Sequence, residues 1–419
     1  MAPGGRSVDG QWLAGTMRPM GTARVGIEPA VVLRQAAELT GAPDVVLPTE
    51  VVGLLDVLCA SLHAEAALTM RGRLLAHDEV LRALTNRFLL ERLAPAKGDE
   101  APIVTHHHAL GCGPLIVTGL PRTGTTYLHG LLAATPMLRA VTFWEARRPA
   151  ARALAGSGEV PDAMSVARFE SALLLDHLYK KAPELRGVHA MDVDEPEECA
   201  QLLQVDLRSS YFEAGFFVPS YTRALLDADM APAYDIEARL LDLIGGRVDV
   251  DPPARLEPSW RWVVKNPDTL RCYTTAADHL GADVVVWCHR DPVDVVTSWC
   301  SLVALTRSAS AKVERTTLGA EWLVRLANGY HEARRLRTAR PDVVVVDVDY
   351  DHLVACPDEV VADVTAACGV CDTAISTGDV SGSDEAATRR ETHTYAPEDF
   401  GLDRDQIRDA FRTSAGEAA

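Results

Sequence analysis

The sequence predicts an α/β protein with a parallel sheet flanked by helices. Two observations favour this class. Short continuous apolar runs, typical of strands buried on both faces, alternate with helical stretches. A glycine-rich turn, Gly119–Thr126, directly follows the first of these runs. Of the 419 residues, 47% are apolar and 24% charged, so the chain has enough apolar side chains for a full core.

The N-terminal part is predicted to be an arm followed by helices. Residues 1–28 are rich in Gly, Arg and Met without periodicity, which indicates a mobile arm. Residues 29–110 form a predicted helical segment. Its clearest helix has Thr49 as a plausible N-cap and an apolar stripe that repeats every three or four residues, Val51, Leu54, Leu55, Leu58 and Leu62.

Residues 111–377 are predicted to form the α/β domain. Its expected strands are 115–119, 261–264, 283–288 and 343–346. Its expected helices start at 125 and cover 163–179, 195–208, 268–280, 293–305 and 320–340. A mostly helical insertion at about 180–260 should lie over the carboxyl ends of the strands, where ligands bind. Residues 378–419 are predicted to be a loop and a helix that starts near Asp405.

Composition excludes several classes of function. With 41 Lys and Arg against 59 Asp and Glu, the net charge is −18, which argues against nucleic-acid binding. No apolar run approaches 18 residues, and no signal-peptide pattern is visible, so we expect a cytoplasmic protein without stable membrane insertion. The nine cysteines are scattered along the chain, and we expect them to be reduced thiols. The lone Cys368–Cys371 pair and the triplet His106–His108 are weak candidates for metal ligands.

The turn Gly119-Leu-Pro-Arg-Thr-Gly-Thr-Thr126 predicts an anion site. Backbone amides in such a turn converge on a phosphate, and the next helix adds the positive end of its dipole. The turn is P-loop-like but differs from GxxxxGK[ST], because Thr125 replaces the lysine and the basic residue is Arg122. Kinases and NTPases use that lysine on the β- and γ-phosphates, so its absence argues against their chemistry.

The segment Pro121–Tyr127 resembles the 5′-phosphosulfate loop of sulfotransferases, whose usual form is PKxGTTW. These enzymes use 3′-phosphoadenosine-5′-phosphosulfate (PAPS). The resemblance implies that Tyr127 stacks on adenine and that the phosphosulfate is bound by Arg122, Thr123, Gly124, Thr125 and Thr126. It covers roughly residues 30–413 and is best with the bacterial branch found in many actinobacteria.

A second segment, Asp283–Ser298, resembles the family's 3′-phosphate site. A predicted strand ends at Arg290, whose forked guanidinium suits a phosphate. Ser298 follows about two turns into a helix. The resemblance implies that both residues bind the 3′-phosphate. In the alternative, Arg290 pairs with Asp291 or Asp294 and Ser298 is an ordinary helix residue.

Lys265 ends another predicted strand, 25 residues before Arg290. It resembles the family lysine near the transferred sulfuryl group. Two residues later, where cytosolic phenol and steroid sulfotransferases have a catalytic histidine, this chain has Pro267. Bacterial relatives often read KSPxH, and Thr269 stands at that histidine position as well. The base must therefore come from elsewhere.

Glu145 is the predicted general base. It lies 23 residues after Arg122, within the interval where the carboxylate-using branch of the family carries its base. Flanking aromatics would partly desolvate it and raise its strength as a base. A role at a helix N-terminus or in an ion pair with Arg147 or Arg148 is the alternative. His189 and Glu198 are further candidates, in a segment where Asp194 is expected to cap a helix.

Together these features predict a sulfotransferase that moves a sulfuryl group from PAPS to a hydroxyl of a small, apolar acceptor, such as an alcohol, phenol, lipid or other secondary metabolite. Glu145, Lys265 and Arg122 would be catalytic, and no metal would be required. Aromatic residues of the insertion could line the acceptor pocket: Tyr211, Phe212, Phe216, Phe217 and Tyr221. Closure of Arg389 and Arg390 over the donor and homo-oligomer formation are left open. The alternatives are a P-loop small-molecule kinase and a catalytically silent nucleotide-binding or scaffold protein.

Overall fold

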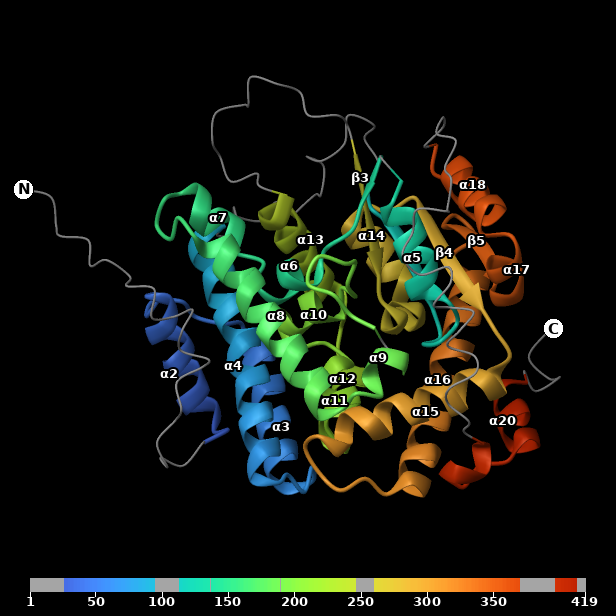
Figure 1. Ribbon diagram of the computed structural model, residues 1–419, viewed down its shortest axis with the longest axis horizontal. Coiled ribbons are helices and arrows are strands. Elements are labelled where there is room, and N and C mark those ends of the chain that lie inside the picture. Colours follow the sequence, from blue (N-terminus) through green and yellow to red (C-terminus); the bar gives the residue numbers. More distant parts are fainter. Residues whose placement is uncertain are drawn as a thin grey trace, which may run out of the picture.

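The computed structural model describes residues 26–94, 113–135, 137–188, 190–245, 260–369 and 396–412. Parallel strands form its sheet in the order β2–β3–β1–β4–β5 (Figure 1). They are β1 (Leu115–Gly119), β2 (Leu138–Arg139), β3 (Arg261–Lys265), β4 (Val284–His289) and β5 (Val344–Asp349). The predicted α/β class is confirmed.

Alternate residues of the strands pack on opposite faces of the sheet. Ile116 and Val264 belong to a core shared with the N-terminal and middle helices. Val117 and Val263 belong to a second core, formed with α5 (Thr125–Ala133) and α18 (Pro357–Ala367). Because both faces are covered, the central strands are continuously apolar rather than alternating.

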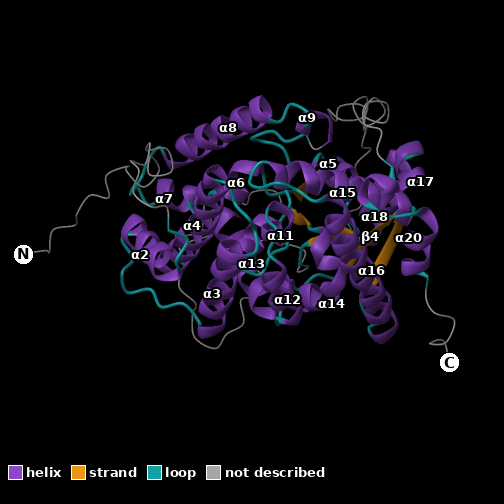
Figure 2. Cartoon of the chain, turned by 90° about the horizontal axis from the view of Figure 1, so that it is seen from below, coloured by secondary structure: helices purple, strands orange, loops and turns teal. Residues whose placement is uncertain are grey.

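The other helices are α2 (Pro29–Thr40), α3 (Thr49–Ala64), α4 (Met70–Leu93), α6 (Phe143–Arg147), α7 (Ala151–Gly156), α8 (Ala163–Lys181), α9 (Leu185–Val188), α10 (Ala200–Leu203), α11 (Tyr211–Gly215), α12 (Pro219–Asp227), α13 (Ala231–Gly245), α14 (Tyr273–Leu280), α15 (Pro292–Ser308), α16 (Arg315–Ala339), α17 (Tyr350–Ala355) and α20 (Arg404–Phe411). Short 3-10 helices are η1 (Gln204–Asp206), η2 (Pro267–Cys272) and η5 (Pro397–Phe400). Helices α2–α4 lie at the opposite end of the molecule from α17 and α18 (Figures 1 and 2).

The N-terminal helices share the main core with the α/β part. Helix α4 also docks through buried polar side chains, because Arg87 donates to Asp206 of η1 and Arg82 to Gln204. Thr49 is the first residue of α3 and not its N-cap, which is Pro48. A threonine does cap the next helix, α4: the hydroxyl oxygen of Thr69 accepts a hydrogen bond from the Gly72 amide at 3.0 Å.

The predicted helix 195–208 is wrong over residues 195–199 and at 207–208, because only α10 and η1, residues 200–206, are helical. Residues 190–199 contain no helix, and α10 begins only at Ala200. Backbone groups of this segment bond across the fold, with the Glu197 amide donating to Val141 and the Cys199 amide to Lys265, both at 2.9 Å. These tertiary bonds replace helical ones. Asp194 therefore caps no helix and pairs with Arg168 at 2.9 Å.

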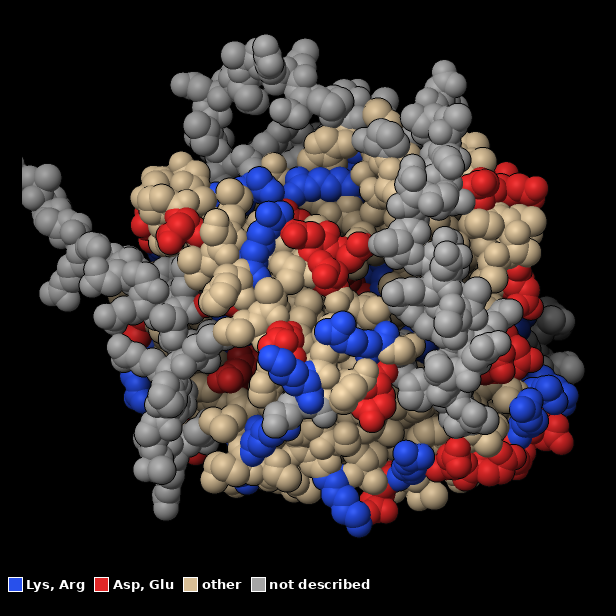
Figure 3. Space-filling model, in the orientation of Figure 1, with Lys and Arg blue, Asp and Glu red and all other residues tan. Residues whose placement is uncertain are grey.

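The carboxyl ends of β1, β3, β4 and β5 meet at one edge of the sheet, which is where open parallel sheets bind ligands. Basic and acidic side chains are interspersed on the face of the molecule shown in Figure 3. Among the helices that the structure describes, none is both long and apolar enough to cross a membrane.

Candidate functional site

The phosphate loop, residues 119–126, joins β1 to α5 and requires two glycines. Gly119 has φ 153°, and a Cβ there would lie 2.6 Å from the Cys288 carbonyl oxygen. Gly124 has φ 89°, and a Cβ would lie 2.9 Å from the Tyr350 ring. Arg122 also has a positive φ, 71°, which is uncommon for a residue with a side chain. Such strained residues concentrate at functional sites.

Arg122, Arg290 and Ser298 meet at this loop, although 168 residues separate the two arginines. The Arg122 Nε donates to Ser298 Oγ at 3.1 Å. One Arg290 nitrogen donates to the Arg122 carbonyl oxygen at 3.1 Å. Arg290 also contacts Asp294 at 3.3 Å, the pairing that the sequence left as an alternative. The two predicted phosphate sites therefore adjoin each other.

Tyr350 is a neighbour of this cluster that sequence reasoning missed. It is the first residue of α17, directly after β5. The Arg290 guanidinium lies over its ring at 4.2 Å from the centroid. The same ring limits the space beside Gly124. Its position at a strand's carboxyl end is the signal that could have identified it.

Lys265 lies at the end of β3 with its side chain 1% exposed. Its ammonium group donates to Thr126 Oγ1 at 3.1 Å and to a Glu198 carboxylate oxygen at 2.5 Å. The lysine thus connects the phosphate loop to the segment before α10. Glu198 is 27% exposed, so its carboxylate is accessible from the site.

Two further titratable groups lie close to Lys265. Burial, reinforced by the neighbouring Glu198, raises the pKa of Glu197 to about 7, although Lys265 opposes the shift. Burial and Lys265 lower the pKa of His129, on α5, to about 3. The His129 Nε2 lies 3.2 Å from the Val263 carbonyl oxygen. This histidine is therefore neutral near pH 7.

Glu145 occupies a different environment. It is the third residue of α6 and forms a capping box with Thr142, whose amide and hydroxyl both lie 3.1 Å from Oε2. Its other oxygen accepts from Arg139 at 2.8 Å and from Arg152 at 3.2 Å. These contacts fit the N-terminal helix role that the sequence left open. The predicted role of Glu145 as the base stays a prediction.

The other predicted donor-binding residues of the phosphate loop and α5 differ in their contacts. Thr123 donates its hydroxyl to the Leu120 carbonyl oxygen at 2.7 Å. Thr125 is buried at the start of α5. Tyr127 packs against the core beside α18, where burial and Asp358 raise its pKa. Its stacking on adenine stays a prediction.

A cavity of about 60 Å³ adjoins the site. It extends from Leu120, Pro121 and Glu198 to Trp299 of α15 and Trp322 of α16. The five aromatics that the sequence suggested as an acceptor pocket are not among its lining residues. Three of those five belong to the main core instead: Phe212, Phe216 and Tyr221.

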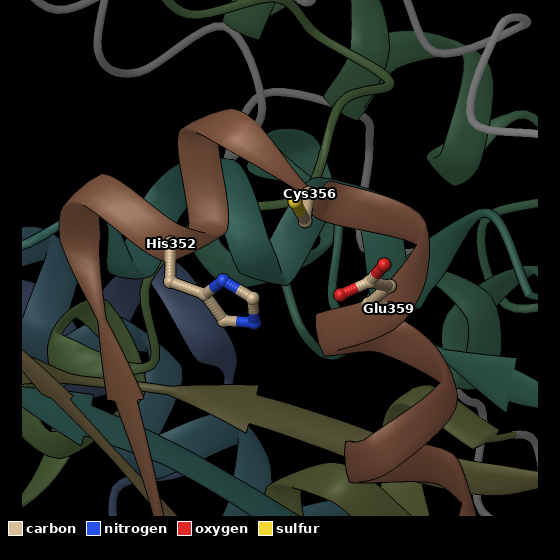
Figure 4. A group of neighbouring side chains, drawn as sticks. All are labelled: His352, Cys356 and Glu359. Atoms are coloured by element: carbon tan, nitrogen blue, oxygen red, sulfur yellow. The ribbon is translucent and has the colours of Figure 1, made fainter.

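Several predicted residues lie outside the described parts of the chain: His106–His108, His189, Cys371, Arg389 and Arg390. A different group of potential metal ligands lies on α17 and α18. The ligand atoms of His352, Cys356 and Glu359 are all within 4.8 Å of one another (Figure 4). The α17 side chains nearest to Gly124 of the phosphate loop are Tyr350 and Leu353, and we assign the His352 group no part in the site.

Comparisons with known proteins identify the family and the fold. A family model described as "Sulfotransferase family" matches residues 114–373, more than half of the chain. The solved structure of sulfotransferase STF1 from Mycobacterium tuberculosis H37Rv is similar, with 28% identity, 91% of this chain and 97% of that chain covered, and a TM-score of 0.71. Sulfotransferase STF9 from Mycobacterium avium shares the fold, with 20% identity, coverage of 94% and 96%, and a TM-score of 0.70. A comparison with curated proteins gives no match.

Proposed function

Because the chain belongs to the sulfotransferase family, we propose that it transfers a sulfuryl group from PAPS to a hydroxyl group of a small acceptor. The observation that carries this proposal is the contact of Arg290 and Ser298 with Arg122 of the phosphate loop. A donor with one anionic group at its 5′ end and another at its 3′ position suits two adjoining basic sites. ATP has no 3′-phosphate that could occupy the second basic site.

In this proposal the phosphosulfate lies against the amides of residues 122–126 and the start of α5. Arg290 and Ser298 hold the 3′-phosphate. The chain holds its arginines close together through hydrogen bonds before any ligand binds, so less side-chain freedom is lost on binding. Tyr350 keeps the Arg290 guanidinium in place by stacking.

The transfer forms a bond between the acceptor oxygen and sulfur and breaks the bond between sulfur and the 5′-phosphate oxygen. Adenosine 3′,5′-bisphosphate is the leaving group. Lys265, held by Thr126 and buried, would stabilise negative charge on the leaving oxygen. Arg122 would stabilise charge on the sulfuryl oxygens. Side-chain cations supply the positive charge, and no step uses a metal ion.

The acceptor's proton goes to a carboxylate, and the contacts favour Glu198. Its carboxylate lies at the lysine and lines the cavity beside the phosphate loop. A general base must be within hydrogen-bond reach of the proton that it removes. Glu145, the base that the sequence predicts, is the alternative. Its two oxygens accept four hydrogen bonds from residues of its own segment.

The test is release of adenosine 3′,5′-bisphosphate from PAPS in the presence of a mixed set of alcohols, phenols and sugars, with chelator or with Mg²⁺. We expect acceptor-dependent release that is nearly unchanged by EDTA. No release from PAPS, together with group transfer from ATP that requires Mg²⁺ and is abolished by chelator, would favour a kinase. Tight binding of the product without turnover of any acceptor would favour a silent nucleotide-binding protein.

A further inference from the structure

We propose that His352, Cys356 and Glu359 bind a divalent metal ion of the zinc class at the corner between α17 and α18. An imidazole nitrogen, a thiol sulfur and a carboxylate oxygen of these residues all lie within 4.8 Å of one another. Figure 4 shows the three side chains grouped where α17 leads into α18. The ion takes no part in sulfuryl transfer, and this inference does not rest on the proposed function.

The turn at Cys356 gathers the three ligands. This residue ends α17 and precedes α18, with φ −136° and ψ 59°. Its amide still donates to the His352 carbonyl oxygen at 2.8 Å, so these two residues, four apart, lie on one face of the last turn. In one continuous helix His352 and Glu359 would be about 10 Å apart along the axis. Pro357 instead starts α18 in a changed direction, and Glu359, in its first turn, comes within reach of His352.

The ligand types select the kind of ion. Thiolate and imidazole are ligands of Zn²⁺ and similar transition-metal ions, and a carboxylate completes a mixed set of three. Mg²⁺ and Ca²⁺ prefer oxygen ligands throughout. A tetrahedral zinc ion with bonds of about 2.0–2.3 Å needs ligand atoms about 3.5 Å apart. Side-chain rotation that brings these atoms closer by roughly 1 Å would therefore form the site, with water as the fourth ligand.

The cluster is accessible and lies in a region of negative charge. His352 and Glu359 are exposed and Cys356 is half-buried, so an ion can enter from solvent without opening the fold. Residues 341–369 contain seven acidic side chains and no lysine or arginine. Local charge of one sign attracts ions of the opposite sign. The surroundings of the cluster therefore favour a cation.

An ion at this corner would tie together two helices that pack beside the phosphate loop. Leu353 of α17 and Val360 of α18 belong to the second core, together with residues of α5. Tyr350, at the start of α17, stacks on Arg290. Because metal binding requires the folded arrangement of the ligands, it should stabilise the folded chain. The chemistry of transfer uses other groups and should stay nearly unchanged when the ion is removed.

The test titrates the full-length protein, reduced and treated with chelator, with Zn²⁺ alone, using calorimetry. We expect a Kd below about 10 μM and a Tm that rises by a few degrees in excess zinc. Mg²⁺ should bind at least about a hundredfold more weakly. Co²⁺ in place of zinc should give the charge-transfer absorption of a cobalt–thiolate bond. A zinc Kd above about 10 μM, or cobalt binding without that absorption, would overturn the proposal.

Single substitutions locate the ion. His352→Ala, Cys356→Ala and Glu359→Gln each remove one ligand and should weaken zinc binding at least about tenfold, and Cys356→Ala should abolish the cobalt–thiolate absorption. Asp363→Asn, at an exposed acid one turn further along α18, is the matched control and should bind zinc like the wild type. Unchanged binding in all three ligand variants, or loss only in Cys371→Ser, would place the ion elsewhere and contradict the assignment. Because His352 and Glu359 are exposed, their variants still decide if Cys356→Ala does not fold.

Discussion

Two glutamates, Glu198 and Glu145, differ in what surrounds them. Glu198 is paired with the lysine at the end of β3 and lines the cavity. Glu145 is buried and bonded to Thr142, Arg139 and Arg152. The spacing from Arg122 predicts Glu145 as the base. Spacing does not reveal which side chains donate hydrogen bonds to the Glu145 carboxylate. The contact between Glu198 and Lys265 lies next to a tertiary bond, from the Cys199 amide to the Lys265 carbonyl oxygen, that no local pattern predicts.

We expect Glu198→Gln to lower kcat on an alkyl alcohol by about 10²–10⁴-fold, the usual contribution of a general base. An acidic phenol, already ionised, should lose much less. Glu145→Gln, the matched variant, should keep most of its turnover and lower Tm, because two arginines lose their counter-charge. Steady-state kinetics and thermal melts measure both. The reverse pattern, with turnover lost only in Glu145→Gln at unchanged product affinity, would restore Glu145 as the base.

At the scale of elements, the phosphate loop and α5 follow directly from the sequence. Gly119, Gly124 and the helix start at Thr125 lie where the motif indicates. The contact of this loop with α17 could not be predicted, because Tyr350 lies more than 200 residues away with only a strand end to mark it. The stretch 195–199 was wrongly predicted as helix, since its backbone groups bond to residues 141, 143 and 265 instead.

Gly124→Ala tests whether the loop geometry is needed. A Cβ at a φ of 89° is strained and would lie 2.9 Å from the Tyr350 ring. We expect product binding, measured by calorimetry, to weaken by at least about tenfold, or about 1.4 kcal/mol. Gly130→Ala, on the same helix with open space around its Cα, is the control and should bind normally, with α5 stabilised by about 0.5–1 kcal/mol. Normal binding by the Gly124 variant would mean that the loop tolerates a side chain there.

At the scale of the whole molecule, the α/β class and the parallel sheet follow from the alternation of strands and helices, but the order of the strands does not. The buried polar contacts between distant helices were not predictable either. Arg87 with Asp206, and Arg325 with Glu213 and Asp268, join elements more than 50 residues apart. The division at residue 110, the cytoplasmic location and any homo-oligomer stay predictions. The lining of the cavity was also unforeseen, because its residues come from six separate segments: 120–121, 198, 210, 266–271, 299 and 322–329.

Glu237 links stability to pH. It is 2% exposed on α13, and burial raises its pKa from 4.5 to about 8. The folded state therefore holds this proton more tightly than the unfolded state. Its contribution to stability is complete below about pH 4.5 and is lost as the pH rises through about 8. Burial also raises the pKa of Glu197, to about 7, so its contribution to stability is likewise lost as the pH rises.

Between about pH 5 and pH 9, the wild-type Tm should therefore fall more steeply than that of Glu237→Gln, which carries no titrating group at this position. Differential scanning calorimetry across this range measures the effect. Glu38→Gln, at an exposed carboxylate on α2, should follow the wild type. Parallel curves for wild type and Glu237→Gln would show that Glu237 has an ordinary pKa.

The central claim is that the two adjoining basic sites recognise a nucleotide with both 5′ and 3′ anionic groups. Its most direct test compares the thermal shift produced by adenosine 3′,5′-bisphosphate with those of adenosine 5′-monophosphate and of ATP with Mg²⁺, in wild type and in Arg290→Ala. We expect the bisphosphate to stabilise the wild type most, by about 2.7 kcal/mol at a hundredfold excess over Kd. Arg290→Ala should weaken bisphosphate binding by about 2–4 kcal/mol, or roughly 30- to 1,000-fold, and monophosphate binding much less. Equal stabilisation by ATP with Mg²⁺, or equal losses for both adenosine ligands in Arg290→Ala, would contradict the account.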